Sequence, residues 1–157
     1  MPGAATAATR MVHSADPEAT TRLGRSLGQV AQAGDLVCLW GDLGAGKTHL
    51  AKAFAVGLGV TETVTSPSFI LMAEYRARLP LFHIDPYRLA SAEDALAGGL
   101  IDERQREGVT LVEWPERLGD ALPAARLDVR IDVTGETTRT ITLTAGAEDY
   151  RRYLDAA

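Results

Sequence analysis

The sequence predicts an α/β fold, a three-layer sandwich with a mixed central sheet and an antiparallel hairpin near the carboxyl end. At the front, the continuous apolar run Leu36 to Trp40 is followed by a glycine-rich loop and a helical segment from about Lys47 to Val56. Continuous apolar runs of this length are typical of strands buried on both faces. At the back, apolar and polar residues alternate in "RLDVRIDV" and again in "TRTITLT", with the turn "TGET" between them. This alternation predicts a hairpin with one solvated face.

Other segments supply the remaining elements. Asp16 is a good N-cap residue and Pro17 suits the first helical position, so a helix is expected to begin there. Strands are expected in "SFILMAEY", "LFHID" and "VTLVEW", and a short helix at Ser91, where "SAED" has the form of a capping box. Residues 1–13, rich in Ala and Thr, are expected to be a disordered tail before a single domain of residues 14–157.

The composition narrows the class of protein. A chain of 157 residues has room for one sizeable core, and 46% apolar with 24% charged residues is typical of a soluble globular protein. No stretch approaches the roughly 20 apolar residues of a membrane-spanning helix, and the amino end lacks the apolar core of a signal peptide. The single cysteine, Cys38, cannot form an internal disulfide. We expect a cytoplasmic protein with no membrane association.

The charge argues against autonomous nucleic-acid binding. The net charge is −5, from 16 basic and 21 acidic residues, and no run of Lys and Arg forms a basic cluster. Proteins that grip nucleic acid by themselves usually neutralise its phosphates with a basic face.

The glycine-rich loop matches a phosphate-binding pattern. "GDLGAGKT" fits G-x-x-x-x-G-K-[ST] at every fixed position, between a predicted strand and a predicted helix. In such a loop the backbone N–H groups and the helix N-terminus hold phosphate oxygens. Lys47 can place its charge on the β- and γ-phosphates, and the Thr48 hydroxyl can coordinate Mg²⁺. The expected nucleotide-binding residues are Gly41, Asp42, Leu43, Gly44, Ala45, Gly46, Lys47 and Thr48. The fold is therefore expected to be that of a P-loop NTPase.

Two carboxylates follow apolar strands and are candidates for the opposite side of this site. Asp85 follows "LFHI" and Glu113 follows "VTLV", so both should emerge at the sheet edge near the loop. One could hold Mg²⁺ and the other polarise an attacking water, and the residues alone do not apportion these roles. The alternative is that each simply ends its strand. His83 is expected to be a packed residue, and His49 an exposed residue of the first helical turn.

A second loop, "TSPSF", presents Ser66 and Ser68 just before a strand. It could sense the γ-phosphate as switch loops do, or it could be an ordinary strand entry. No N-K-x-D guanine-reading motif and no arginine-rich lid segment occur in the sequence. A small-molecule kinase and a nucleotide-dependent binding module without required hydrolysis stay open as alternatives to an ATPase.

Four segments together carry a resemblance to a known family: "GDLGAGKTHL", "TSPSFILMAEY", "LFHIDPYRL" and "LVEWPERL". In their order and spacing, from about Leu23 to Val133, they resemble the TsaE (YjeE) family, bacterial ATPases of tRNA threonylcarbamoyladenosine biosynthesis. The resemblance implies a cytoplasmic protein that binds ATP or ADP with Mg²⁺ and hydrolyses ATP slowly by itself. It also implies docking on the TsaB–TsaD pair, which modifies adenosine 37 of tRNA, so that tRNA is met only through the complex.

The resemblance also implies roles for particular residues. Lys47, Asp85 and Glu113 would be catalytic, with Thr48 and Glu113 as magnesium ligands. Ser66 and Ser68 would lie in the family's switch-like loop. The rim of the adenine pocket would lie around residues 15–18.

This sequence departs from the family's usual pattern at three positions. Ser68 stands where Thr is more usual, His49 where Thr is more usual, and Pro86 where Leu is common after the motif's acidic residue. Pro86 bears on the orientation of the neighbouring Asp85. Trp114 and Tyr87 are candidate anchors for a protein partner or, equally, core residues.

Overall fold

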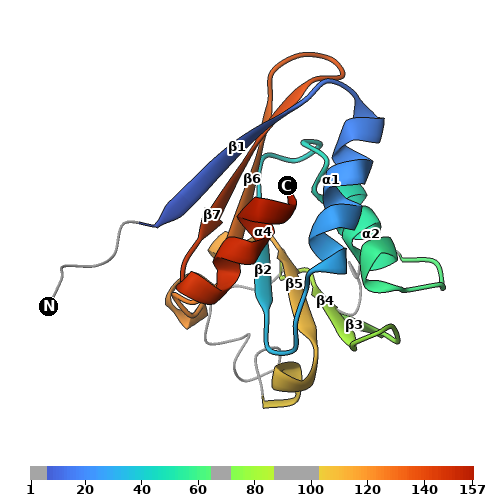
Figure 1. Ribbon diagram of the computed structural model, residues 1–157, viewed down its shortest axis with the longest axis vertical. Helices are drawn as coiled ribbons and strands as arrows, with labels where there is room; N and C mark the ends of the chain where they lie inside the picture. Colours follow the sequence, from blue (N-terminus) through green and yellow to red (C-terminus); the bar gives the residue numbers. More distant parts are fainter. Residues whose placement is uncertain (1–6, 65–71, 87–102) are drawn as a thin grey trace, which may run out of the picture.

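A computed structural model describes residues 7–64, 72–86 and 103–157. They form a seven-stranded sheet of order β1-β7-β6-β2-β5-β4-β3 (Figure 1). Strands β6, β2, β5 and β4 are mutually parallel, whereas β1, β7 and β3 are antiparallel to their neighbours. The strands are β1 (Ala8–Ser14), β2 (Leu36–Trp40), β3 (Met72–Tyr75), β4 (Leu81–Ile84), β5 (Val109–Glu113), β6 (Leu127–Val133) and β7 (Arg139–Ala145). The predicted mixed sheet and the predicted carboxyl-terminal hairpin, β6 with β7, are confirmed.

Helices α1, α2 and α4 lie on one face of the sheet (Figure 1). Short 3-10 helices complete the described residues, and η2 and η3 pack on the opposite face through Leu118 and Leu122. The helix expected from Ser91 lies outside the described residues, so the third layer of the sandwich stays a prediction. The helices are α1 (Pro17–Gln29), α2 (Lys47–Leu58), α4 (Arg151–Ala156), η1 (Glu103–Glu107), η2 (Pro115–Arg117), η3 (Gly119–Ala121) and η4 (Glu148–Tyr150).

The ends of α1 and α2 differ in a way that matters for the site. Asp16 caps α1, accepting a hydrogen bond from the Ala19 backbone N–H at 2.8 Å, and Pro17 occupies the first turn, as predicted. Helix α2 instead begins after Gly46, and no side chain caps it. The first N–H groups of α2 therefore have no side-chain acceptor at this end of the helix.

Strand β2 lies in the middle of the sheet and is buried on both faces. Val37 and Leu39 pack with the helices, while Leu36 and Cys38 pack on the other side with Ile84. The continuous apolar run seen in the sequence reflects this double burial. Because β2 leads directly into the glycine-rich loop, the core fixes the position of the loop.

The expectation of a disordered tail over residues 1–13 was wrong for residues 8–13. These residues belong to β1, which pairs with β7 from Ala8 opposite Ala145 to Ser14 opposite Arg139. The strand is rich in small and polar residues, but Val12 is partly buried against the core and the remaining stability comes from backbone pairing. A period-2 pattern this weak gives little signal in the sequence.

The carboxyl-terminal helix α4 was also not predicted. Asp35, buried just before β2, accepts hydrogen bonds from the Arg152 guanidinium and, at 2.5 Å, from the Tyr153 hydroxyl. Arg152 Nε also donates to the Val30 carbonyl at 3.0 Å. On the other side, Arg10 of β1 donates to the Leu154 carbonyl at 2.8 Å. These contacts fasten α4 to the start of β2 and to β1. None of the described helices is long and apolar enough to cross a membrane.

Candidate nucleotide-binding site

The glycine-rich loop connects β2 to α2 and borders open space at Gly44 and Gly46. Gly44 and Gly46 both have positive φ, 82° and 112°, a backbone conformation that side chains other than glycine's rarely adopt. A Cβ added at either position would meet no atom within 4 Å. Open space therefore adjoins the loop at these two positions, as a phosphate cradle requires.

Lys47, the first residue of α2, is buried although it carries a charge. Its Nζ donates to the Gly41 carbonyl at 2.7 Å and lies 3.2 Å from the centre of the Trp114 ring. Burial lowers the pKa of Lys47, and the neighbouring carboxylates, first Glu116 and then Glu113, oppose this effect only in part. The loop thus holds its one lysine between a backbone carbonyl and an aromatic face.

Trp114, whose ring contacts Lys47, has an unusual backbone conformation. Its φ of 55° makes it the one non-glycine residue with positive φ among the residues that the structure describes. Such a conformation costs energy and is found preferentially at functional sites. It turns the chain directly after Glu113, so that β5 ends at the loop.

Glu113 is the centre of a buried hydrogen-bond network. The Thr48 hydroxyl donates to Glu113 Oε1 at 2.8 Å, and His83 Nε2 lies 2.6 Å from Oε2. Burial raises the pKa of Glu113, but the hydrogen bond and charge of His83, followed by the Thr48 hydrogen bond and the Lys47 charge, outweigh it. The net pKa therefore lies below the usual value, so this carboxylate stays ionised although it is only 3% exposed.

The structure places the candidate residues around one cavity of about 280 Å³. Asp85, at the end of β4, is buried and lines it beside Glu113. The cavity is lined by Leu43, Gly44, Gly46, Lys47, Thr48, His49, Asp85, Glu113 and Trp114. Convergence of the two carboxylates on the loop follows from parallel β4, β2 and β5, whose carboxyl ends share one sheet edge.

Three residues of the predicted set do not line this cavity. Gly41 accepts the Lys47 hydrogen bond, and the Asp42 carbonyl accepts the Ala45 N–H at 3.0 Å, which closes the turn of the loop. Ala45 is buried against the core. Ser66, Ser68 and Tyr87 lie outside the described residues.

A second cavity, of about 190 Å³, adjoins the first at Gly46 and His49. His49 is exposed, as expected, and its Nε2 lies 2.8 Å from the Thr21 hydroxyl, which links α2 to α1. The second cavity is lined by Pro17, Thr20, Ala45, Gly46, His49, Glu136, Thr137 and Arg139. Of residues 15–18, where the rim of a base pocket was expected, Pro17 is among them.

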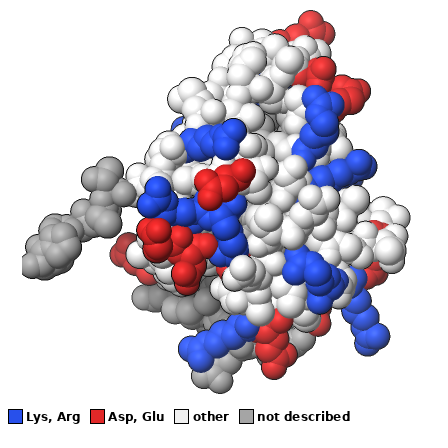
Figure 2. Space-filling view, viewed as in Figure 1, with Lys and Arg blue, Asp and Glu red and all other residues white. Residues whose placement is uncertain are grey.

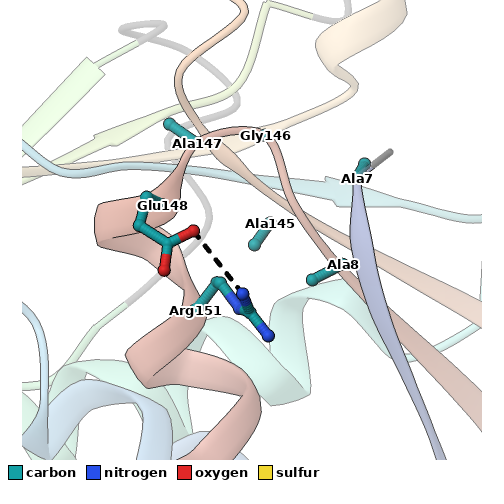
Figure 3. Close-up of a pocket in the computed structure, with 7 residues that line it drawn as sticks. All are labelled: Ala7, Ala8, Ala145, Gly146, Ala147, Glu148 and Arg151. Carbon is teal, nitrogen blue, oxygen red and sulfur yellow. Dashed lines mark ion pairs between the residues drawn. The ribbon is translucent and has the colours of Figure 1, made fainter. Parts of the chain in front are cut away.

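A third cavity, of about 170 Å³, lies at the opposite end of β7 (Figure 3). Its charged groups, Glu148 and Arg151, form an ion pair at 3.5 Å. It is lined by Ala7, Ala8, Ala145, Gly146, Ala147, Glu148 and Arg151. No residue of the sequence motifs contributes to it.

The chain is similar to known proteins in sequence and in fold. The family model described as "Threonylcarbamoyl adenosine biosynthesis protein TsaE" matches residues 14–141. The chain is 41% identical over 136 residues to the tRNA threonylcarbamoyladenosine biosynthesis protein TsaE of Bacillus subtilis, covering 86% of this chain and 85% of that protein. It is 40% identical over 134 residues to the protein of the same name from Streptomyces coelicolor, covering 80% and 90%. The crystal structure of Bacillus subtilis YdiB superimposes with a TM-score of 0.79 at 35% identity, covering 96% of this chain and 95% of that one.

The chain belongs to the TsaE family. The matched residues of this TsaE family member include the glycine-rich loop, Asp85 and Glu113, and they end within β7, before α4. The resemblance stated from four sequence segments is thereby confirmed.

Two residues of this TsaE family member contact the site although the sequence did not single them out for it. His83 was expected to be a packed residue, and it is fully buried, but it also contacts Glu113 directly. Its position two residues before Asp85, in the strand beside β5, was the available signal. Arg139 donates from Nε to the Ala45 carbonyl at 2.9 Å, and no local motif marks it.

Proposed function

We propose that this TsaE family member is a P-loop ATPase that binds and slowly hydrolyses Mg-ATP and takes part in threonylcarbamoyladenosine modification of tRNA position 37. The observation that carries the proposal is the joining of Thr48 to Glu113, beside Lys47, at the uncapped start of α2. A hydroxyl and a carboxylate beside a lysine at a helix N-terminus are the groups that a magnesium-bound triphosphate needs.

The residues present fit a magnesium ion held partly by the nucleotide. No group of three or more His, Cys, Asp or Glu side chains suited to a metal ion occurs within residues 7–64, 72–86 and 103–157. Magnesium bound with nucleotides commonly takes only one or two protein ligands and completes its shell with phosphates and water. Thr48 and Glu113 would hold it, and the ion would supply charge neutralisation at the β- and γ-phosphates.

The hydrogen bonds of Glu113 support different roles for the two carboxylates, Glu113 and Asp85. Both oxygens of Glu113 are engaged, one by Thr48 and one by His83, and its pKa is held low. A carboxylate in this state is a good metal ligand and a poor proton acceptor. Asp85, in the same cavity, would then orient the attacking water.

In hydrolysis, the water oxygen would form a bond to the γ-phosphorus while the bond from that phosphorus to the β–γ bridging oxygen breaks. The products are ADP and inorganic phosphate, and the proton of the water passes to Asp85 or to a phosphate oxygen. Lys47 would stabilise the charge that develops on the phosphates. To do so, its Nζ has to exchange the Gly41 carbonyl and the Trp114 face for phosphate oxygens.

The second cavity supports a place for the nucleoside. It adjoins the phosphate site at Gly46 and is bounded by the start of α1 and the β6–β7 turn. Its lining combines Pro17, Thr20 and Thr137 with the charged residues Glu136 and Arg139. We place the base and ribose of ATP in this cavity.

The surface charges support contact with tRNA through a protein complex. On the face shown in Figure 2, Lys and Arg side chains are interspersed with Asp and Glu and form no continuous basic stripe. A net charge of −5 adds to this argument. The partner we propose, on the family resemblance, is the TsaB–TsaD pair.

The proposal is tested by measuring ATP turnover with and without purified TsaB and TsaD, together with tRNA modification. We expect slow turnover by the protein alone, stimulation by the pair, and loss of turnover in Glu113→Gln and Asp85→Asn variants that still bind ADP. Arg130→Ala, on the exposed face of β6, is the matched control and should behave as the unsubstituted protein. Phosphate transfer to a small acceptor without partners would favour a kinase instead. Full modification by a variant that binds but cannot hydrolyse ATP would favour a binding module.

A further inference from the structure

Arg139, the first residue of β7, joins the β6–β7 hairpin to the glycine-rich loop. Its Nε donates to the Ala45 carbonyl at 2.9 Å. Its Nη1 donates to carbonyls of the hairpin turn, Thr138 at 2.8 Å and Gly135 at 3.1 Å. One guanidinium therefore spans two segments that are 94 residues apart in the chain.

The bond to Ala45 fixes the orientation of a single peptide unit. The described residues contain no cis peptide bond, so the C=O of Ala45 and the N–H of Gly46 point in opposite directions across one plane. With the carbonyl held toward Arg139, the Gly46 N–H is directed away from the hairpin. Gly46 lines the phosphate-site cavity, and a Cβ built on it meets open space.

Glycine at position 46 makes this restraint necessary. The φ of Gly46 is 112°, in a region where glycine has wide conformational freedom, and no side chain caps the helix that follows. A peptide with such freedom can rotate unless a partner holds it. Arginine suits this task because it stays protonated and its planar donors have a fixed geometry.

Besides orienting the Ala45–Gly46 peptide, Arg139 strengthens its hydrogen bond to the Ala45 carbonyl through its positive charge. A hydrogen bond from a cationic donor is shorter and stronger than one between neutral groups. It also polarises the peptide that accepts it, which makes the N–H on the other side a better donor. Arg139 would thus strengthen a hydrogen bond from the Gly46 N–H to an anion through the peptide between them.

We propose that Arg139 is a positioning residue that holds the Ala45–Gly46 peptide so that the Gly46 N–H donates to a nucleotide phosphate. This inference rests on the proposed function, because it requires that the loop binds a nucleotide. In this proposal the β6–β7 hairpin stabilises the phosphate-binding loop through Arg139.

Because Arg139 also lines the second cavity, the experiment separates phosphate from nucleoside binding. Dissociation constants are measured for ADP by calorimetry and for adenosine by competition, in Arg139→Ala, Arg139→Gln and Arg139→Lys. Arg130→Ala is the matched control, since it removes an exposed arginine of the same hairpin whose guanidinium pairs with Asp132. Thermal melting establishes that each variant is folded. Arg139→Gln keeps an amide donor for the turn and allows the comparison if Arg139→Ala does not fold.

We expect Arg139→Ala to weaken ADP binding about tenfold and adenosine binding by a clearly smaller factor, with Arg139→Lys recovering part of the loss. In ¹H–¹⁵N spectra without nucleotide, the Gly46 amide resonance should shift in Arg139→Ala and stay in place in Arg130→Ala. Equal ADP affinity in all folded variants, or equal losses for ADP and adenosine, would overturn the inference alone. Absence of ADP binding to the unsubstituted protein would overturn the proposed function itself.

Discussion

The contact between His83 and Glu113 allows a quantitative test of the site's electrostatics. His83→Leu replaces a fully buried imidazole with an apolar side chain and leaves Glu113 Oε2 without its 2.6 Å partner. The other ring nitrogen, Nδ1, has no hydrogen-bond partner among the described residues, so the substitution removes a single bond. Leaving a buried charged acceptor unsatisfied costs about 2–3 kcal/mol. We expect the free energy of unfolding to fall by about that amount at pH 7.

A double-mutant cycle isolates this interaction from other effects of the substitution. Glu113→Met removes the carboxylate, and the coupling between His83→Leu and Glu113→Met should be about 1.5–3 kcal/mol. Urea denaturation followed by far-ultraviolet circular dichroism gives the four free energies. Met11→Ala, an exposed position of β1 four strands away from β5, serves as the uncoupled partner in a control cycle. A coupling below about 0.5 kcal/mol for His83 with Glu113 would refute the reasoning.

The pH dependence of the same cycle follows from the lowered pKa of Glu113. A carboxyl group with a depressed folded-state pKa contributes stability that is fully present above its unfolded pKa, about 4.3 for Glu. That contribution is lost as the pH falls through the folded-state value. The part of the coupling that depends on the ionisation of Glu113 should therefore be lost only as the pH falls below about 4.3. A titration of the Glu113 carboxyl, followed by ¹³C spectroscopy, with a midpoint above about 4.3 would contradict the assigned direction.

Three further predictions concern binding, packing and reactivity. Lys47→Ala should raise the ADP dissociation constant at least about tenfold, because the loop loses its one cation; unchanged affinity by calorimetry would argue against the site. Gly28→Ala should lower the free energy of unfolding by about 2 kcal/mol or more, since its Cβ would lie 2.1 Å from the Phe54 carbonyl oxygen; an unchanged urea midpoint would contradict the close approach of α1 to α2. Cys38 should react with a disulfide reagent only upon unfolding, because it is fully buried and burial raises the pKa of its thiol; rapid reaction in the native protein would be inconsistent with this burial.

The central part of the fold was predictable because its signals are local. The β2 strand is a continuous apolar run, α1 begins at an Asp–Pro cap, and the β6–β7 hairpin alternates with period 2. Each of these patterns has one physical explanation, and each element formed where it was expected. Strand β3, from Met72 to Tyr75, confirms the second half of the strand that was expected in "SFILMAEY".

The elements that the sequence did not reveal depend on distant partners. Strand β1 has weak alternation and is held by pairing with β7, and α4 is a six-residue helix fastened by Asp35. A helix this short has little stability of its own. Neither element can be inferred without knowing which distant residues it meets.

The residues of the candidate site fall into the same two groups: some are marked by local sequence patterns, and others reach the site only through contacts between distant segments. The residues of a contiguous motif, from Gly41 to Thr48, and the two carboxylates at strand ends could be found from spacing. Arg139 could not be assigned to the site, and His83 had only its position two residues before Asp85 as a signal. Their contacts with the Ala45 carbonyl and Glu113 arise only when segments separated in the chain become neighbours.

Strands β1 and β7 lie side by side in the sheet although nearly the whole chain separates them. Ribosomes add about 5–20 residues per second, so the synthesis of β7 is completed roughly 7–26 seconds after that of β1. During that interval the backbone groups of β1 are hydrated or shielded by other factors, and the sheet lacks its outermost member. Completion of this edge is therefore a late event in the biogenesis of the protein, and a truncation that removes β7 would leave β1 without its pairing strand.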